Sequence, residues 1–378
     1  MPMDIASNRD ELEAWLILLR APQLAASRVR ELLERHGAAA GALEHARRGD
    51  GVDRAVTRTW LRKPDRNALA GDFAWLAIDG HRLLTLDEAD FPPLLRESSG
   101  GPAGLFVAGD ASALLQPQVA IVGSRNASQG GLANAKSFAR ALAGAGLAIT
   151  SGLAEGIDAA AHEAALEAGV ATIAVLGTGP DVIYPARNRE LAARIETAGA
   201  LVSEFAPGTP GRPDNFPRRN RIIAGLTLGT LVVEAGLRSG SLITARSASD
   251  QGRDVFAIPG SIHHPLARGC HQLIRNGAML VESAAEIVEA LRPLAAGLGA
   301  ALRERLELAQ SPAQAAPVRD PVYSRLLAAL GHEAVGIDAL AERTGLGAPA
   351  LSAMLLDLEL DGEVAAERGG LYVRRPPG

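Results

Sequence analysis

The densest set of residues that could bind a charged ligand lies at 215–221, which reads Asn-Phe-Pro-Arg-Arg-Asn-Arg. Guanidinium groups pair with phosphates through two parallel hydrogen bonds, and a nucleobase can stack on the ring of Phe216. The polar residues of this segment and its upstream neighbour are Arg212, Arg218, Arg219, Asn220 and Arg221. We therefore predict that this segment binds a polyanion with accessible bases.

Two alternatives remain for these arginines. They could form a solvated run of charge, but that interpretation leaves the adjacent Phe216 unexplained. Some of them could instead brace the fold through Glu204 or Glu234, because helical spacing would turn part of the cluster inward.

Small and polar residues follow the apolar runs that we expect to be strands. Glycines at strand-to-helix turns let main-chain N–H groups approach an anion, and the helix dipole adds positive charge there. The candidate binding residues at these turns are Ser124, Arg125, Gly152, Ala154, Gly156, Gly240 and Ser241. The alternative is that the glycines serve tight turns only.

No catalytic or metal motif accompanies these turns. Asp158 and His162 share a helix face at i, i+4, where a structural hydrogen bond is favoured over an acid/base pair. Cys270 is the only cysteine, and we expect a buried apolar residue rather than a nucleophile. The phosphate-binding GxxxxGK[ST] motif is absent, and Gly177-Thr178-Gly179 lacks the third glycine of the dinucleotide fingerprint. We predict no catalytic residue, no metal and no cofactor.

Composition is that of a globular chain without a membrane span. Of the 378 residues 47% are apolar and 21% charged, and no apolar run reaches the length of about 18 residues that a membrane span needs. The N-terminus carries acids where a signal peptide would carry bases, so we expect a cytoplasmic protein. The net charge of −5 does not exclude nucleic acid, because local clustering sets the field that a ligand meets.

Apolar runs alternate with helical stretches from residue 118 onward. This pattern predicts an α/β fold, an extended Rossmann-like doubly wound parallel sheet over 118–291, with 81–115 as a lead-in. The expected strands are Val119–Val122, Leu147–Thr150, Thr172–Leu176, Ala200–Ser203, Thr230–Val233, Val255–Ile258 and Ala278–Val281. Ligands of such sheets bind outside the carboxyl ends of the strands, at the switch in strand order.

Two smaller domains should flank this sheet. Residues 1–80 have the pattern of a small helical domain of the SAM or helix-hairpin type, ahead of the domain at 81–292. A linker at 293–320 precedes three helical patterns and two strand-like runs at 321–378, which describe a winged helix. That last segment holds five arginines against eight acidic residues, so we expect it to contact protein rather than duplex DNA.

Seven segments, in this order, resemble the motifs of the DNA-processing protein A (DprA/Smf) family, over roughly residues 80–290. They are VAIVGSR, SGLAEGIDAAAHEAAL, TIAVLGTGPDVIYPARNREL, SEFAPG, NFPRRNRIIAGL, VVEAGLRSGSLITARSASDQGRDVFAIPG and GCHQLIRNGA. The resemblance implies a single-stranded DNA-binding protein of natural transformation, without enzymatic activity. Such a protein protects incoming DNA, helps to load the RecA recombinase and acts as a homodimer.

The resemblance also assigns a DNA pocket to Arg125 beside Ser124, to the glycine-rich turns and to a stacking aromatic that we place at Phe216. One departure is Ala186 after Tyr184-Pro185, where the family often has a basic residue; Arg187 or Arg189 could substitute. Another is 268–271, which differs from the expected Ser-Gly-x-Asn.

Two other functions remain as alternatives. The first is a Rossmann-like nucleotide-binding protein or nucleoside monophosphate hydrolase, although residues 234–241 lack the PGGxGTxxE motif of those hydrolases. The second is a transcription regulator acting through the winged helix, which the acidity of that domain disfavours.

Overall fold

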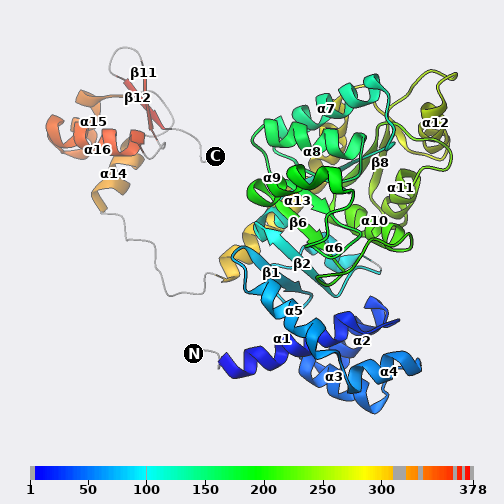
Figure 1. Cartoon of the computed structure of the whole chain (residues 1–378). Helices are drawn as coiled ribbons and strands as arrows, with labels where there is room; N and C mark the ends of the chain where they lie inside the picture. The colour runs from blue at the N-terminus through cyan, green and yellow to red at the C-terminus, as the bar shows by residue number, and fades with distance from the viewer. Residues whose placement is uncertain are drawn as a thin grey trace. The chain divides into compact units, whose positions relative to one another are not determined.

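The computed structural model describes two compact units of the chain, 1–303 and 304–378 (Figure 1). The residues described within them are 5–98, 100–309, 321–330, 335–360, 364–367 and 371–374. None of the described helices is both long and apolar enough to cross a membrane.

A nine-stranded sheet in the order β1-β2-β6-β5-β4-β3-β7-β8-β9 forms the centre of the first unit. Its strands are β1 (His81–Thr85), β2 (Gly104–Gly109), β3 (Gln118–Val122), β4 (Ala148–Ser151), β5 (Thr172–Val175), β6 (Ala200–Ser203), β7 (Gly229–Val232), β8 (Asp254–Ala257) and β9 (Met279–Leu280). The seven strands from β3 to β9 pair in parallel, whereas β1 and β2 add antiparallel at one edge. The predicted α/β class is confirmed, and the lead-in extends the sheet.

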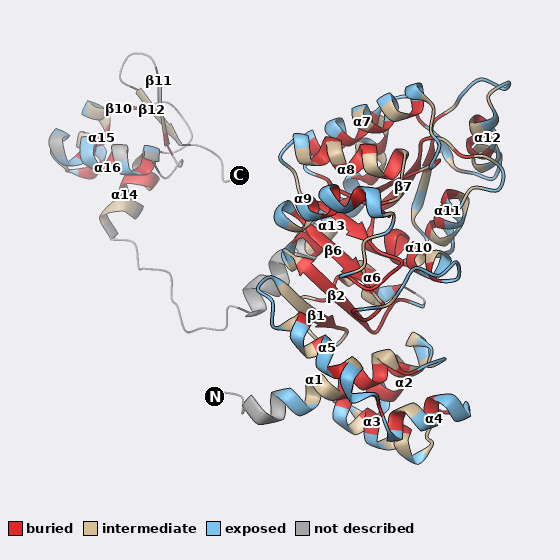
Figure 2. Ribbon diagram, viewed as in Figure 1, coloured by how far each residue is buried: buried red, intermediate tan, exposed pale blue. Residues whose placement is uncertain are grey.

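Both faces of the sheet are covered by helices (Figures 1 and 2). These are α6 (Pro93–Glu97), α7 (Gln129–Gly144), α8 (Ile157–Glu167), α9 (Arg189–Ala198), α10 (Asn215–Leu226), α11 (Ser241–Asp250), α12 (Arg268–Arg275) and α13 (Ala284–Ala309). Along β3, Val119 and Ile121 pack in the core formed with α7, α8 and α13, while Ala120 and Val122 pack with α10 and α11. This two-sided burial explains why the strands are continuous apolar runs.

The strand order reverses at β3, whose neighbours are β4 on one side and β7 on the other. The chain runs outward from β3 through β4, β5 and β6, and then returns along α10 to place β7 beside β3. A crevice opens at such a point because the helices that follow the two central strands lie on opposite faces of the sheet. The loops after β3, β4 and β7 therefore converge there.

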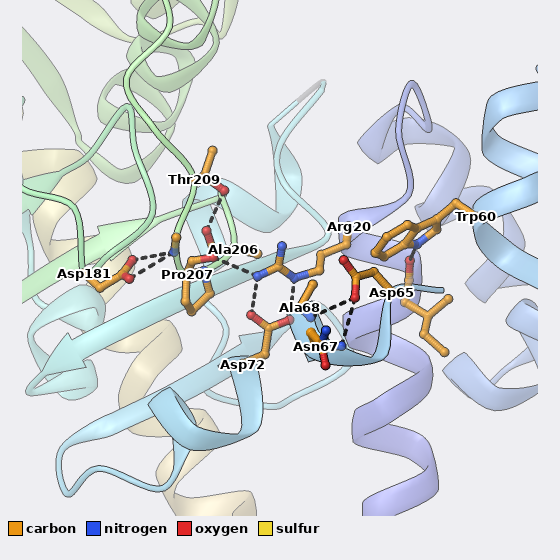
Figure 3. Close-up of polar contacts among 12 residues, drawn as sticks. Arg20, Trp60, Asp65, Asn67, Ala68, Asp72, Asp181, Ala206, Pro207 and Thr209 are labelled. Carbon is orange, nitrogen blue, oxygen red and sulfur yellow. Dashed lines mark hydrogen bonds and ion pairs between the residues drawn. The ribbon is translucent and has the colours of Figure 1, made fainter. Parts of the chain in front are cut away.

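Five helices at the N-terminus form a further core with β2 and α9. They are α1 (Ile5–Arg20), α2 (Ala26–His36), α3 (Ala39–Arg48), α4 (Ala55–Arg62) and α5 (Arg66–Leu76). Trp75 of α5 meets Phe106 of β2 edge to face, with ring centroids 5.9 Å apart. Arg20 donates to both oxygens of Asp72, at 2.5 and 2.6 Å, and at 2.7 Å to the carbonyl of Pro207 in the loop after β6 (Figure 3). The helices are thus fastened to the sheet domain.

The segment predicted as a linker differs from expectation in its first part. Helix α13 continues to Ala309 and includes Pro293, while 310–320 lie outside the described residues. Ala, Leu, Glu and Arg dominate 294–309, and these residue types favour a helix strongly.

The second unit has the helices and strands predicted for a winged helix. They are α14 (Pro321–Leu330), β10 (Val335–Gly336), α15 (Ile337–Thr344), α16 (Ala348–Leu360), β11 (Val364–Glu367) and β12 (Leu371–Arg374). The strands pair in the order β10-β12-β11, and Leu326, Leu340 and Leu355 form the centre of a separate core.

His162 of α8 is fully buried against β4 and β5. Its Nδ1 lies 2.7 Å from the Thr172 hydroxyl, which itself donates to the Ile149 carbonyl at 2.6 Å. The hydroxyl proton is already used, so the Nδ1–H donates to Thr172 and the buried Nε2 carries the lone pair. Burial, and secondarily the charge of Arg219, lower the pKa of His162 from 6.5 to about 3, so the folded protein keeps this ring neutral.

We predict that His162 makes the protein acid-sensitive. Between pH 6.5 and the lowered pKa, the unfolded chain binds a proton at His162 that the folded chain does not, so stability falls as pH falls. From pH 6.5 to pH 5 the loss from this residue is about 2 kcal/mol. Chemical denaturation across pH should show that His162→Gln lacks this component, whereas His263→Gln, at an exposed position, retains it. Identical pH profiles for the wild type and His162→Gln would contradict the prediction.

Candidate DNA-binding pocket

A pocket of about 750 Å³ lies at the carboxyl ends of β3, β4 and β7 and against the start of α10. The prediction of a crevice at the switch in strand order is thus confirmed. Eight of the predicted binding residues line it, namely Ser124, Arg125, Ala154, Phe216, Arg219, Asn220, Gly240 and Ser241.

Arg125 and Phe216 lie together at this pocket. The Arg125 guanidinium carbon stands 5.7 Å from the centroid of the Phe216 ring, within the range of a cation–π contact. Arg125 is exposed, and no ion pair of the described residues involves it. Tyr184, which is 51% exposed, contacts the same Phe216 ring; the two ring centroids are 5.5 Å apart. The pocket therefore presents an uncompensated positive charge next to two aromatic rings.

Gly177 explains how Phe216 reaches this position. A Cβ at residue 177 would lie 2.8 Å from Cδ1 of Phe216, so the ring packs directly on the main chain after β5. The Gly-Thr-Gly segment that resembled part of a nucleotide fingerprint thus accommodates the chain's own aromatic side chain.

Arg219 lines the pocket but is only 5% exposed. Its Nη1 donates at 2.6 Å to the Gly152 carbonyl and also to the Val175 carbonyl, and its Nε donates at 3.0 Å to Oδ1 of Asn220. Burial lowers the pKa of Arg219 to about 10, and the nearby Asp158 opposes this shift. The side chain stays charged at neutral pH but is already used to join the ends of β4 and β5 to α10.

Asn220 connects α10 to the turn before α11. Its Nδ2 donates to the Gly240 carbonyl at 3.3 Å. In the same turn the hydroxyls of Ser239 and Ser241 lie 2.7 Å apart. These small polar groups line the pocket together with Ala154 and Ser124.

Three predicted arginines do not face this pocket. Arg212, Arg218 and Arg221 line a separate groove on the other side of α10. A helix advances about 100° per residue, so 218 and 221 share a face while 219 points away from both. Glu204 accepts from both of them, from Arg218 at 3.4 Å and from Arg221 at a shorter distance. The bracing through Glu204 that we considered is present.

Gly152 and Gly156 belong to the packing of the site rather than to its lining. A Cβ on Gly152 would lie 2.4 Å from Nη1 of Arg219, and one on Gly156 would lie 2.3 Å from the Ser124 carbonyl oxygen. Gly156 also has φ of 77°. Close approach within the chain requires both glycines, which favours the structural alternative at these two positions.

The acidic and sulfur groups near the pocket are engaged within the fold. Oδ2 of Asp158 accepts from the main-chain N–H of Gly152 at 3.0 Å and of Ala154 at 3.4 Å. Burial raises the pKa of Asp158, opposed mainly by the charge of Arg219. Cys270 is fully buried, and burial raises the pKa of its thiol to about 11. The structural interpretation of Asp158 and the apolar interpretation of Cys270 both fit these contacts.

One His/Asp cluster in the described residues has the composition of a metal site. His36, His45 and Asp50 of the N-terminal helices offer ligand atoms within 4.8 Å of one another. The two imidazole rings stack in parallel, 3.8 Å apart, and Asp50 already pairs with His36 at 2.9 Å and with Arg35 at 3.3 Å. The lone pairs of stacked rings do not converge on one ion, so this arrangement does not fit a bound metal.

Arg238 and Tyr184 are among the lining residues that were not predicted as site residues. Arg238 is exposed in the loop between β7 and α11, and Tyr184 lies beside Phe216. Its position in the loop after an expected strand is a usable signal for Arg238, because Gly240 and Ser241 of the same loop are predicted on that ground. Arg187 does not line the pocket; it pairs with Glu155 at 2.9 Å.

Comparison with known proteins identifies relatives over most of the chain. The model of the family described as DNA recombination-mediator protein A matches residues 82–292, and that of the DprA winged helix domain matches 310–370. Protein Smf of Escherichia coli (strain K12) is 45% identical over 310 residues, which cover 82% of this chain and 81% of that protein. DNA processing protein DprA of Streptococcus pneumoniae is 50% identical over 200 residues, 52% of this chain and 70% of that one.

Two solved structures share this architecture. The X-ray structure of DNA processing protein A from Streptococcus pneumoniae has a TM-score of 0.66 at 38% identity, covering 73% of this chain and 97% of that one. A structure of DNA processing protein A from Helicobacter pylori, described by its single-stranded DNA binding mode, has a TM-score of 0.51 at 28% identity and covers 56% and 96%. With its sheet domain and its winged helix both matched, the chain belongs to the DNA recombination-mediator protein A family, the DprA/Smf proteins.

Proposed function

We propose that the chain binds single-stranded DNA without cutting it, with phosphate on Arg125 and a base on Phe216, as a recombination mediator in DNA uptake. The observation that carries this proposal is the exposed guanidinium of Arg125, which forms no ion pair among the described residues and stands 5.7 Å from the centroid of an aromatic ring. Positive charge attracts the backbone, and a ring can stack a base only where that base is free of a partner strand. The pocket thus suits a single strand better than a duplex.

The contact set we propose is narrower than the set of predicted residues. Ser124, Ala154, Asn220, Gly240 and Ser241 line the pocket beside Arg125 and Phe216, together with the exposed Arg238. Arg219 acts by positioning, because its guanidinium is buried on main-chain carbonyls. Gly152 and Gly156 act by permitting close packing.

A nucleotide hydrolase is the alternative function, and the site provides little support for it. Asp158 is occupied by main-chain amides and His162 by Thr172, so neither is available as an acid or base in the pocket. The N-terminus of α7, where the first helix of a Rossmann fold binds pyrophosphate, holds the Glu234 carboxylate instead. Glu234 accepts from the Ser128 amide at 2.9 Å and its hydroxyl at 2.5 Å. A phosphate there would meet a like charge.

Protection of incoming DNA, loading of RecA, dimerisation and a cytoplasmic location complete the proposal. They rest on membership of the family. Exposed apolar side chains of the edge strand β9, Met279 and Leu280, and of Ile262 in the loop after β8 favour a second copy as a partner. The acidic winged helix remains proposed as a contact for protein rather than for duplex DNA.

We predict that Arg125→Ala weakens binding to single-stranded DNA and flattens its dependence on salt. Losing one phosphate contact should reduce the slope of log K against log salt by about 0.7 for a single strand. Fluorescence anisotropy titrations over a salt series measure both quantities. Arg140→Ala removes an exposed arginine on α7 outside the pocket and serves as the control. If the salt slope of Arg125→Ala equals that of the wild type, the assignment of DNA binding to this pocket is wrong.

Loss of the stacking surface should be separable from loss of charge. Phe216→Ala should cost about 1–3 kcal/mol of binding free energy and leave the salt slope near the wild-type value, because no phosphate contact is removed. Phe216→Trp should restore most of the affinity. Because the Phe216 ring is half-buried, the thermal unfolding of each variant is measured to check that it is still folded. A binding cost near zero for Phe216→Ala would exclude stacking, and release of adenine from AMP by the pure protein would favour the hydrolase.

A further inference from the structure

A second groove, of about 810 Å³, runs between the N-terminal helices and the sheet domain. One wall is the turn between α1 and α2, residues 19–27, and the other is formed by the loop after β6 and the outer face of α10. We call it the interdomain groove. Its lining includes Arg20, Arg212, Arg218 and Arg221 but only one carboxylate, Glu204, so it is net positive in a chain whose overall charge is −5.

Part of this positive charge is free to meet a ligand. Arg212 is exposed and enters no ion pair of the described residues. The side chain of Arg218 is 57% exposed, and it shares the single Glu204 with Arg221. One carboxylate cannot satisfy two guanidinium groups, each of which has five donors. The Arg218 guanidinium also stands over the Phe205 ring at 5.0 Å, which holds it at the groove.

The walls of the groove are fixed relative to each other. Arg20 joins Asp72 of α5 to the Pro207 carbonyl across the groove (Figure 3). The Asp72 carboxylate balances the charge of Arg20. The loop after β6 is itself tied down, because Asp181 accepts from the Gly208 amide at 2.8 and 3.0 Å. The interdomain groove is therefore a preformed channel rather than a gap between loosely connected parts.

The wall contributed by the helices contains an unusual backbone conformation. Gln23 has φ of 59°, a left-handed conformation that non-glycine residues seldom adopt. The turn reads Ala21-Pro22-Gln23-Leu24-Ala25-Ala26, and no side chain caps α2 at Ala25. An outlier of this kind facing an arginine-lined groove is consistent with a functional turn.

The groove adjoins the DNA-binding pocket across the first turns of α10. Phe216 and Pro217 face the pocket, while Asn215 and Arg218 face the groove, so residues a single position apart line the two cavities. A strand that stacks a base on Phe216 and continues over this helix start enters the groove, where Arg218 and Arg212 meet its next phosphates.

We propose that the interdomain groove binds the phosphate backbone of the same single strand beside the nucleotide held in the pocket. The N-terminal helices then form one wall of an extended DNA path rather than a separate module. This inference rests on the proposed function and assigns Arg212 and Arg218 to backbone contacts, Arg221 to holding Glu204, and the turn around Gln23 to the opposite wall.

The test compares oligothymidylates that fill only the pocket, about 4 nucleotides, with ones of about 16 nucleotides that also reach the groove. For the full-length Arg212→Ala/Arg218→Ala variant we expect unchanged affinity for the short oligonucleotide, and weaker binding of the long one with a salt slope reduced by about 1.4. Arg54→Ala/Arg58→Ala, which removes two exposed arginines of the N-terminal helices outside the groove, is the charge-matched control. If this variant binds the long oligonucleotide with unchanged affinity and an unchanged salt slope, the proposal that the groove binds DNA is wrong.

A second variant tests the wall formed by the helices. Gln23→Glu places a negative charge in the turn and should weaken binding of the long oligonucleotide only; if it has no effect, the helices form no part of the path. Arg125→Ala separates this inference from the pocket, since it should weaken both lengths. If Arg212→Ala/Arg218→Ala weakens binding of the long oligonucleotide while Arg125→Ala has no effect on either length, the proposed pocket is wrong and the proposed groove stands. Thermal unfolding confirms that each variant is folded.

Discussion

The buried guanidinium of Arg219 is the contact on which the geometry of the site depends. It donates to the Gly152 carbonyl at the end of β4 and to the Val175 carbonyl at the end of β5, and so holds α10 against both strands. Buried charge is costly unless it is hydrogen bonded, and here carbonyl acceptors and the nearby Asp158 offset that cost. Because α10 begins only a turn earlier, fixing Arg219 also fixes Phe216 beside Arg125.

Helix α10 consequently separates two functions that are adjacent in sequence. One face carries Phe216 and Asn220 into the pocket, another carries Arg218 and Arg221 toward Glu204, and Arg219 lies between α10 and the sheet. A run of arginines on a flexible loop could turn together toward one ligand. On a helix packed by Ile222, Ile223 and Leu226, they cannot.

Much of the fold could be predicted because its strands are buried on both faces. The expected runs match the seven parallel strands to within two residues, since apolar side chains are needed on each side of β3 and its neighbours. The location of the pocket followed from the rule for parallel sheets. The separation of the arginines could have been predicted too: Arg219 precedes Ile222, Ile223 and Leu226 by three, four and seven residues, the spacing of one helix face.

Other features depend on contacts between segments far apart in sequence and could not be foreseen. The local sequence does not indicate that Arg20 of α1 reaches Pro207, nearly two hundred residues away. Nor does it indicate that this contact holds the two walls of a groove in place. The continuation of α13 to Ala309 is the opposite case: a Pro/Ala/Gln tract suggested a linker over 293–320, although most residues at 294–309 favour a helix.

The glycines around the site show how a nucleotide-binding architecture is redirected to a polymer. In a dinucleotide-binding fold, such positions leave room for a bound pyrophosphate. Here each is filled from within the chain: Gly152 by Arg219, Gly177 by Phe216 and Gly131 by the Glu234 carboxylate, 2.4 Å from where a Cβ would stand. With these three positions filled, the main chain there has no room for a bound pyrophosphate. Within the pocket, the charge left for a ligand lies on Arg125 and Arg238, and both side chains are exposed. Exposed charges suit a strand that passes across the site and continues beyond it in both directions.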